Sequence, residues 1–184
     1  MMPSRFQIKA AARVIKNQGV ISYPTESVFG LGCLPLSESA VKRLLQLKHR
    51  SVEKGLILIA STLEQLERFT LLSDADRKII NTQNTPTTWL VNKSELTPEW
   101  ISGAHKKVAV RVSTHPVVKA LCNEVGNAIV STSANISTTK AATSALQVRR
   151  YFPVELDYYL TGKTGNIISA TPIVDLETML TIRD

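Results

Sequence analysis

The sequence predicts one α/β domain built on a mixed sheet. Segments with strand character alternate with segments with helix character along the chain of 184 residues. The continuous apolar run from Leu56 to Ala60 is typical of a strand buried at the centre of such a sheet. Neither an internal repeat nor a low-complexity tract interrupts this alternation, so we expect a single domain over residues 1–184.

Helix signals are strongest at two places. Ser4 and Gln7 form a capping box before apolar residues at helical spacing, and Gly19 ends that helix. Pro116 suits the first turn of another helix, which ends at Gly126. The other predicted helices are about Glu38–Lys48, one opening with Ser61 and Glu64, one opening with Ser73 and Asp76, and one near Ser144–Tyr151.

Strand signals are short apolar runs bounded by turn residues. We expect a loop at residues 23–32 after the first strand, and another at residues 131–135 after the fourth. The predicted strands are Val20–Tyr23, Leu56–Ala60, Val108–Val112, Ala128–Val130, and shorter ones around Tyr158–Leu160, Ile173–Leu176 and Met179–Ile182.

Composition narrows the class of protein. The apolar runs are too short to span a membrane. The two cysteines, Cys33 and Cys122, favour a reducing, cytoplasmic setting over a disulfide scaffold. They form no metal-binding spacing with His49, His105 or His115, so we expect no protein-held metal and place these histidines at the surface or in helix caps.

The positive charge is concentrated near the N-terminus. Lys and Arg number 22 against 15 Asp and Glu, and residues 1–54 hold nine of the former and three of the latter. A positive electrostatic field in this region would attract polyanionic partners such as nucleotide phosphates or RNA. A basic protein without such a partner can carry the same net charge.

Three polar segments are candidates for chemistry. Loops 23–32 and 131–135 place hydroxyls where strands end, which suits a carboxylate or phosphate, but turns and helix caps use the same residues. Lys48, Arg50 and Lys54 follow a helix and suit a triphosphate, although cations also stabilise helix C-termini. The sequence lacks both the glycine spacing of a P-loop around Lys163 and the elbow of a serine hydrolase.

Taken together and in order, these segments resemble the YrdC-type threonylcarbamoyl-AMP synthase family across essentially the whole chain. The set is specific because each piece keeps the family's order and spacing. The pieces are Tyr-Pro-Thr-Glu-Ser-Val-Phe-Gly-Leu-Gly at 23–32, Lys-x-Arg at 48–50, Ala-Val-Arg-Val at 109–112, His-Pro at 115–116, Ser-Thr-Ser-Ala-Asn at 131–135 and Thr-Pro-Ile-Val-Asp at 171–175.

The resemblance implies a twisted mixed sheet with flanking helices around a concave, positive cavity. It implies synthesis of threonylcarbamoyl-AMP and pyrophosphate from L-threonine, bicarbonate and ATP, with Mg²⁺ accompanying ATP. A separate complex then passes the threonylcarbamoyl group to an adenosine in tRNA. The implied ATP ligands are Lys48, Arg50, Lys54, Thr88, Ser133, Asn135 and Arg183, with Lys48 and Arg50 catalytic, and the implied threonine ligands are Thr25, Ser131 and Thr171.

Three departures from the family pattern concern this site. Residues 84–88 read Asn-Thr-Pro-Thr-Thr, without the usual glycine before Thr88. Ile59 stands where many members have a histidine, and residues 136–142 lack a common glycine.

Two other functions stay open from the sequence. The chain could be a non-catalytic module that binds double-stranded RNA, or an enzyme that passes a carbamoyl group to another acceptor. The low aromatic content, 5%, gives no stacking platform for single-stranded RNA.

Overall fold

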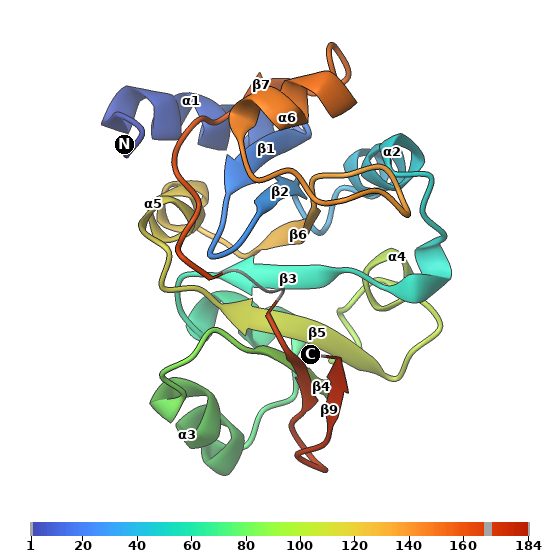
Figure 1. Cartoon of the computed structure of the whole chain (residues 1–184). Helices are drawn as coiled ribbons and strands as arrows, with labels where there is room; N and C mark the ends of the chain where they lie inside the picture. The colour runs from blue at the N-terminus through green and yellow to red at the C-terminus, as the bar shows by residue number, and fades with distance from the viewer. Residues whose placement is uncertain (1, 168–170, 184) are drawn as a thin grey trace.

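The computed structural model describes residues 2–167 and 171–183, and within them nine strands form one mixed sheet (Figure 1). Parallel pairing joins β1 to β7, β3 to β5 and β4 to β8, and the other neighbours are antiparallel. In spatial order the strands are β7 (Tyr158–Tyr159), β1 (Ile21–Pro24), β2 (Phe29–Gly32), β6 (Ile129–Ser133), β3 (Ile57–Ala60), β5 (Lys107–Val112), β4 (Thr88–Asn92), β8 (Ile173–Asp175) and β9 (Thr181–Arg183). The predicted α/β class and the central place of the 56–60 strand are confirmed.

The helices begin and end largely where their capping residues indicate. The Ser4–Gln7 capping box is formed, Pro116 opens the fifth α-helix, and Gly126 ends it in the left-handed region at φ 81°. The helices are α1 (Arg5–Lys16), α2 (Glu38–Leu47), α3 (Asp74–Thr82), α4 (Glu99–Ser102), α5 (Pro116–Val125), α6 (Ala145–Tyr151), and the 3₁₀ helices η1 (Val52–Lys54) and η2 (Glu64–Phe69).

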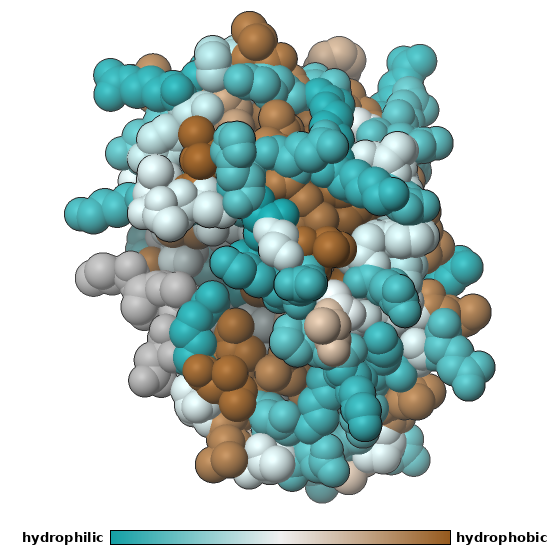
Figure 2. Space-filling view, turned by 90° about the vertical axis from the view of Figure 1, so that its right-hand side faces the viewer, coloured by the Kyte–Doolittle hydropathy of each residue, from teal (hydrophilic) through white to brown (hydrophobic). Residues whose placement is uncertain are grey.

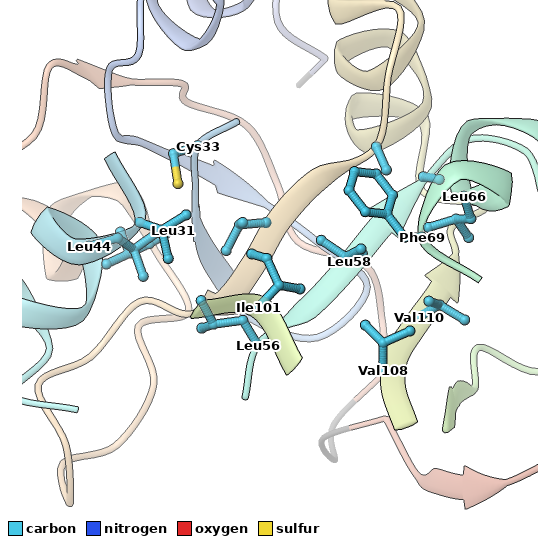
Figure 3. Packing of buried hydrophobic residues seen from close by; sticks show 14 of the residues in the cluster. Leu31, Cys33, Leu44, Leu56, Leu58, Leu66, Phe69, Ile101, Val108 and Val110 are labelled. Carbon is cyan, nitrogen blue, oxygen red and sulfur yellow. The ribbon is translucent and has the colours of Figure 1, made fainter. Parts of the chain in front are cut away.

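Hydrophobic cores lie on both faces of the sheet. On one face α1 and α5 pack on Ile59 of the central strand, and on the other α2 and α4 cover its neighbour Leu58 (Figure 1). In the core beneath α2 and α4, Leu58 lies between Leu44 on one side and Phe69 on the other (Figure 3). Each large apolar side chain buried in this way stabilises the fold by about 1.5–3 kcal/mol.

Two predicted loops are partly strand. Residues 29–32 pair with β1 as the second half of a hairpin, which leaves a loop of residues 25–28. A Cβ at Gly32 would lie 2.5 Å from the carbonyl oxygen of Val130 and 2.8 Å from the Tyr23 ring. This glycine therefore permits close packing inside a strand, where the sequence pattern indicated a loop. Similarly, residues 131–133 belong to β6.

The helix predicted to open with Ser61 and Glu64 is present but begins at Glu64, and the strand at 88–92 was not predicted. The helix that follows Ser61 is a 3₁₀ helix with Leu63 at its N-cap. The Ser61 backbone N–H and hydroxyl donate instead to the side-chain oxygen of Gln65, at 3.0 and 3.1 Å. By contrast, the capping box of Ser73 and Asp76 is present.

The surface facing the viewer in Figure 2 is mostly hydrophilic. Its hydrophobic residues gather in small groups among polar ones and form no broad apolar face. Within residues 2–167 and 171–183, the helices are all too short or too polar to cross a bilayer.

Candidate functional site

A polar cavity of about 160 Å³ lies where the β1–β2 hairpin, the end of β6 and the chain around Thr171 come together. These segments are far apart in sequence, and the antiparallel pairing of β2 with β6 brings the first two side by side. Six of the ten predicted site residues line this cavity: Thr25, Arg50, Ser131, Ser133, Thr171 and Arg183.

A larger cavity of about 480 Å³ adjoins the polar one. Both are lined by Arg50, Leu56, Ile57 and Arg183, so they are two halves of one cleft. The larger half has an apolar floor from the sheet, and the predicted Lys54 lines its edge. One half therefore suits a small polar ligand and the other a larger, partly apolar one.

Lys48 lies behind the wall of the cleft, buried to 2% exposure. Its ammonium donates to the backbone oxygens of Ser133 and Asn135, the latter at 2.7 Å, and to Asn135 Oδ1 at 3.2 Å. Burial, with a contribution from the nearby Arg50 charge, lowers the pKa of Lys48 to about 8. Asn135 in turn donates to the carbonyl oxygen of Thr139. This arrangement fixes the chain at the end of β6.

Arg50 and Arg183 place two guanidinium groups at the boundary between the two halves of the cleft. Arg50 donates to the carbonyl oxygen of Gly55 at 3.0 Å, and Arg183 to that of Thr171 at 3.2 Å. Burial, and then the charge of Arg183, lower the pKa of Arg50. Two positive charges at one boundary of the cleft favour binding of an anion there.

Arg111 also lines the polar cavity, and it was missed as a site residue. Its Nε and Nη2 donate to Thr88 Oγ1 at 2.9 and 2.7 Å. Thr88 Oγ1 lies 3.5 Å from Thr171 Oγ1. Since Thr88 already accepts two bonds from Arg111, its own proton is left for Thr171. The predicted nucleotide ligand Thr88 is thus buried behind Arg111, outside the lining of the cavity.

Glu26, in the hairpin loop, lies on the other side of Arg111. Its Oε2 is 3.5 Å from Arg111 Nη1, and its Oε1 accepts the hydroxyl of Ser113. Both charged side chains are buried, at 4% and 7% exposure. An arginine inside the apolar run 108–112 is the sequence signal for this pair, because a buried cation needs a buried anion.

His115 departs from the prediction that the histidines are exposed or capping. His49 and His105 are exposed. His115 occupies the N-cap of α5, but its side chain makes no capping bond and is buried, with Nδ1 unpartnered within the described structure. Burial lowers its pKa, and the charge of Glu26 opposes that shift.

Residues 13–184 match the Sua5/YciO/YrdC family model, which is described as telomere recombination. The chain belongs to this family. Its 47% identity with the threonylcarbamoyl-AMP synthase of Pseudomonas aeruginosa strain PAO1 extends over 186 aligned residues and 99% of both chains. The synthase of Methylococcus capsulatus strain Bath is 43% identical, over 94% of both chains.

Solved structures of the Sua5/YciO/YrdC family superpose closely on the chain. P. abyssi Sua5 complexed with L-threonine gives a TM-score of 0.88 at 31% identity, covering 95% of this chain and 52% of that one. The chain therefore spans about half the length of that Sua5. E. coli YciO gives 0.86 at 21% identity, covering 100% and 93%, which is a likeness of fold.

Proposed function

We propose that this chain makes threonylcarbamoyl-AMP from L-threonine, bicarbonate and ATP with release of pyrophosphate, which makes it a nucleotidyltransferase. The observation that carries the proposal is the convergence of predicted threonine and phosphate ligands on one cleft. The sequence comparison supports the same proposal, because this chain is 47% identical, over nearly its full length, to a protein named threonylcarbamoyl-AMP synthase.

In this proposal the polar half of the cleft holds threonine. Arg111 is the buried cation that pairs with the carboxylate, because a guanidinium fork matches a carboxylate's two oxygens. Thr25 donates its hydroxyl proton to the carbonyl oxygen of Val28 at 2.7 Å. Its hydroxyl oxygen is therefore free to accept from the ammonium of threonine, with Ser131 and Thr171 as further contacts.

The larger half holds ATP, with its apolar floor under the adenine ring and its phosphates near Arg50, Arg183 and Lys54. Lys48 and Asn135 support this arrangement by fixing the chain that carries Ser133. Among the described residues there is no cluster of three or more His, Cys, Asp or Glu side chains that could hold a metal. Mg²⁺ would therefore arrive with ATP, held by phosphate oxygens and water.

The reaction needs no side-chain nucleophile. The threonine amine attacks the carbon of bicarbonate, and loss of water gives a carbamate. A carbamate oxygen then attacks the α-phosphorus of ATP while the bond to pyrophosphate breaks. The cations of the cleft neutralise charge that develops on the phosphate oxygens. The product would then pass to a cytoplasmic complex that modifies tRNA.

The exposed face of α1 is where we propose that RNA is contacted. Arg5, Lys9, Arg13 and Lys16 recur every three or four residues, so they lie on one side of the helix. All four are exposed, and they form no ion pair within the described residues. Replacing all four with Gln should weaken binding of tRNA and double-stranded RNA and flatten its salt dependence. Unchanged affinity and slope would refute this contact.

The proposed reaction is tested by pyrophosphate release from ATP, Mg²⁺ and bicarbonate with and without L-threonine. We expect release that needs both threonine and bicarbonate. Arg50→Ala should raise the KM for ATP about 10- to 100-fold, since a bond to a charged group contributes about 1.5–3 kcal/mol. Release that ignores threonine would point to another carbamoyl acceptor, and no release from folded protein would refute the enzyme.

A further inference from the structure

We propose that Glu26 is the positioning residue for threonine binding: through Arg111 it holds the guanidinium in the orientation that serves the polar cavity. The inference rests on the proposed function, because it takes threonine as the ligand of that cavity. Glu26 itself is not part of the cavity lining. Its effect on the ligand therefore has to pass through Arg111.

Contacts on two sides fix the Arg111 guanidinium. A guanidinium carries five N–H donors in a planar fork. The edge formed by Nε and Nη2 is bound to Thr88, at 2.9 and 2.7 Å. The other nitrogen, Nη1, lies 3.5 Å from Glu26 Oε2. With one edge tied to Thr88 and the far end attracted to Glu26, the remaining N–H groups are available to the cavity that Arg111 lines.

The two oxygens of the Glu26 carboxylate differ in their hydrogen bonding. Oε1 accepts the Ser113 hydroxyl, while Oε2 is buried and has no hydrogen-bond partner in the described structure. The Arg111 guanidinium is the one cation that forms an ion pair with this carboxylate among the described residues. Because both side chains are buried, this attraction is weakly screened, so the charge of Glu26 acts mainly on Arg111.

The loop that carries Glu26 is itself rigidly held. The Glu26 carbonyl oxygen accepts from the backbone of Ile167 at 3.3 Å, and the Thr25 carbonyl oxygen from Gly165 at 2.9 Å. A Cβ on Gly165 would lie 2.5 Å from the Glu26 oxygen, so the two segments are in tight contact. Glu26 is therefore a fixed anchor, as a positioning residue must be.

Two other ionisable side chains, His115 and Tyr23, lie near the ion pair of Glu26 and Arg111. His115 lies close enough for the Glu26 charge to oppose the lowering of its pKa by burial. Burial lowers the pKa of Arg111, whereas Glu26 and then Tyr23 raise it.

The experiment compares Glu26→Gln with wild type by calorimetric titration with L-threonine and by steady-state kinetics. Glu26→Gln keeps the shape and the Ser113 bond but removes the charge. We expect threonine affinity to fall about 10-fold or more, with the KM for ATP unchanged and kcat at saturating threonine near wild type. Glu67→Gln, which breaks the exposed pair with Arg77, is the matched control and should change neither constant.

A double-mutant cycle separates positioning from a direct or purely structural role. In an Arg111→Met background, Glu26→Gln should have no further effect on threonine affinity, because the group through which it acts is gone. Additive losses, or a Glu26→Gln variant with wild-type affinity, would overturn the proposal. If Glu26→Gln does not fold, Glu26→Asp replaces it, and wild-type affinity in that variant would equally count against precise positioning.

Calorimetry also keeps two failures apart. If wild type binds threonine but releases no pyrophosphate, the proposed reaction fails while the Glu26 comparison is still decided by affinity. If wild type does not bind threonine at all, with or without ATP, the positioning role fails as well.

Discussion

Thr88→Val tests how the floor of the polar cavity is built. Valine keeps nearly the shape of threonine and removes only the hydroxyl that accepts from Arg111 at 2.9 and 2.7 Å. Each hydrogen bond to a charged group contributes about 1.5–3 kcal/mol, so the loss of two predicts destabilisation of about 3–6 kcal/mol. Because domains of this kind have unfolding free energies of about 5–15 kcal/mol, the variant should fold but be weakened.

The same substitution should raise the KM for threonine about 10- to 100-fold, since the freed guanidinium no longer points into the cavity. Urea denaturation gives the stability change and threonine titrations of pyrophosphate release give the KM. Thr87→Val is the matched control. Among the described residues its hydroxyl bonds to Thr85 and Gln83, both neutral, so a loss of about 1 kcal/mol is expected.

The reasoning is refuted if Thr88→Val is as stable as Thr87→Val and keeps the wild-type KM for threonine. A rise confined to the KM for ATP would instead support Thr88 as the nucleotide ligand that the sequence predicted.

Three further predictions concern the surroundings of the cleft. Lys48→Met should cost about 2–4 kcal/mol in urea denaturation, because partly buried carbonyl oxygens at the end of β6, including that of Asn135, lose their donor; unchanged stability would mean that Lys48 serves only a ligand. Gly165→Ala should lower stability by about 1–3 kcal/mol in thermal unfolding, since its Cβ would press on the Glu26 backbone, and a wild-type melt would contradict that contact. The lowered pKa of His115 means that the unfolded chain binds its proton first, so stability should fall as pH drops from about 7 to about 5, and more steeply than in His115→Gln; parallel curves would contradict this.

Local signals in the sequence predicted most of the fold. The capping boxes at Ser4 and Ser73 and the left-handed Gly126 depend on neighbouring residues only, so their patterns are readable from sequence. Ser61 does not cap its helix because Gln65, one residue beyond the capping position, competes for the same donors. The sequence pattern predicts Gly30 and Gly32 to be loop residues. Their role is to leave room for the ring of Tyr23, which strand pairing brings over them.

The candidate site likewise has features that local sequence motifs predict and features that depend on contacts between distant segments. The hydroxyls and cations in ordered motifs gave the lining of the cleft, including Thr25, Arg50 and Thr171. Sequence could not show that the Lys48 ammonium is occupied by backbone oxygens, or that Thr88 lies behind Arg111, because both depend on contacts between distant segments. The lone arginine in an apolar strand is a sequence signal for a buried anion, and that anion is Glu26.

The most direct test of the central claim is the mass of the product formed with isotopically labelled bicarbonate. Purified protein would be incubated with ATP, Mg²⁺, L-threonine and the labelled bicarbonate, and the adenylate analysed at once by mass spectrometry. The account predicts an AMP ester that contains threonine and one labelled carbon. An adenylate without the label, or one without threonine, would contradict it.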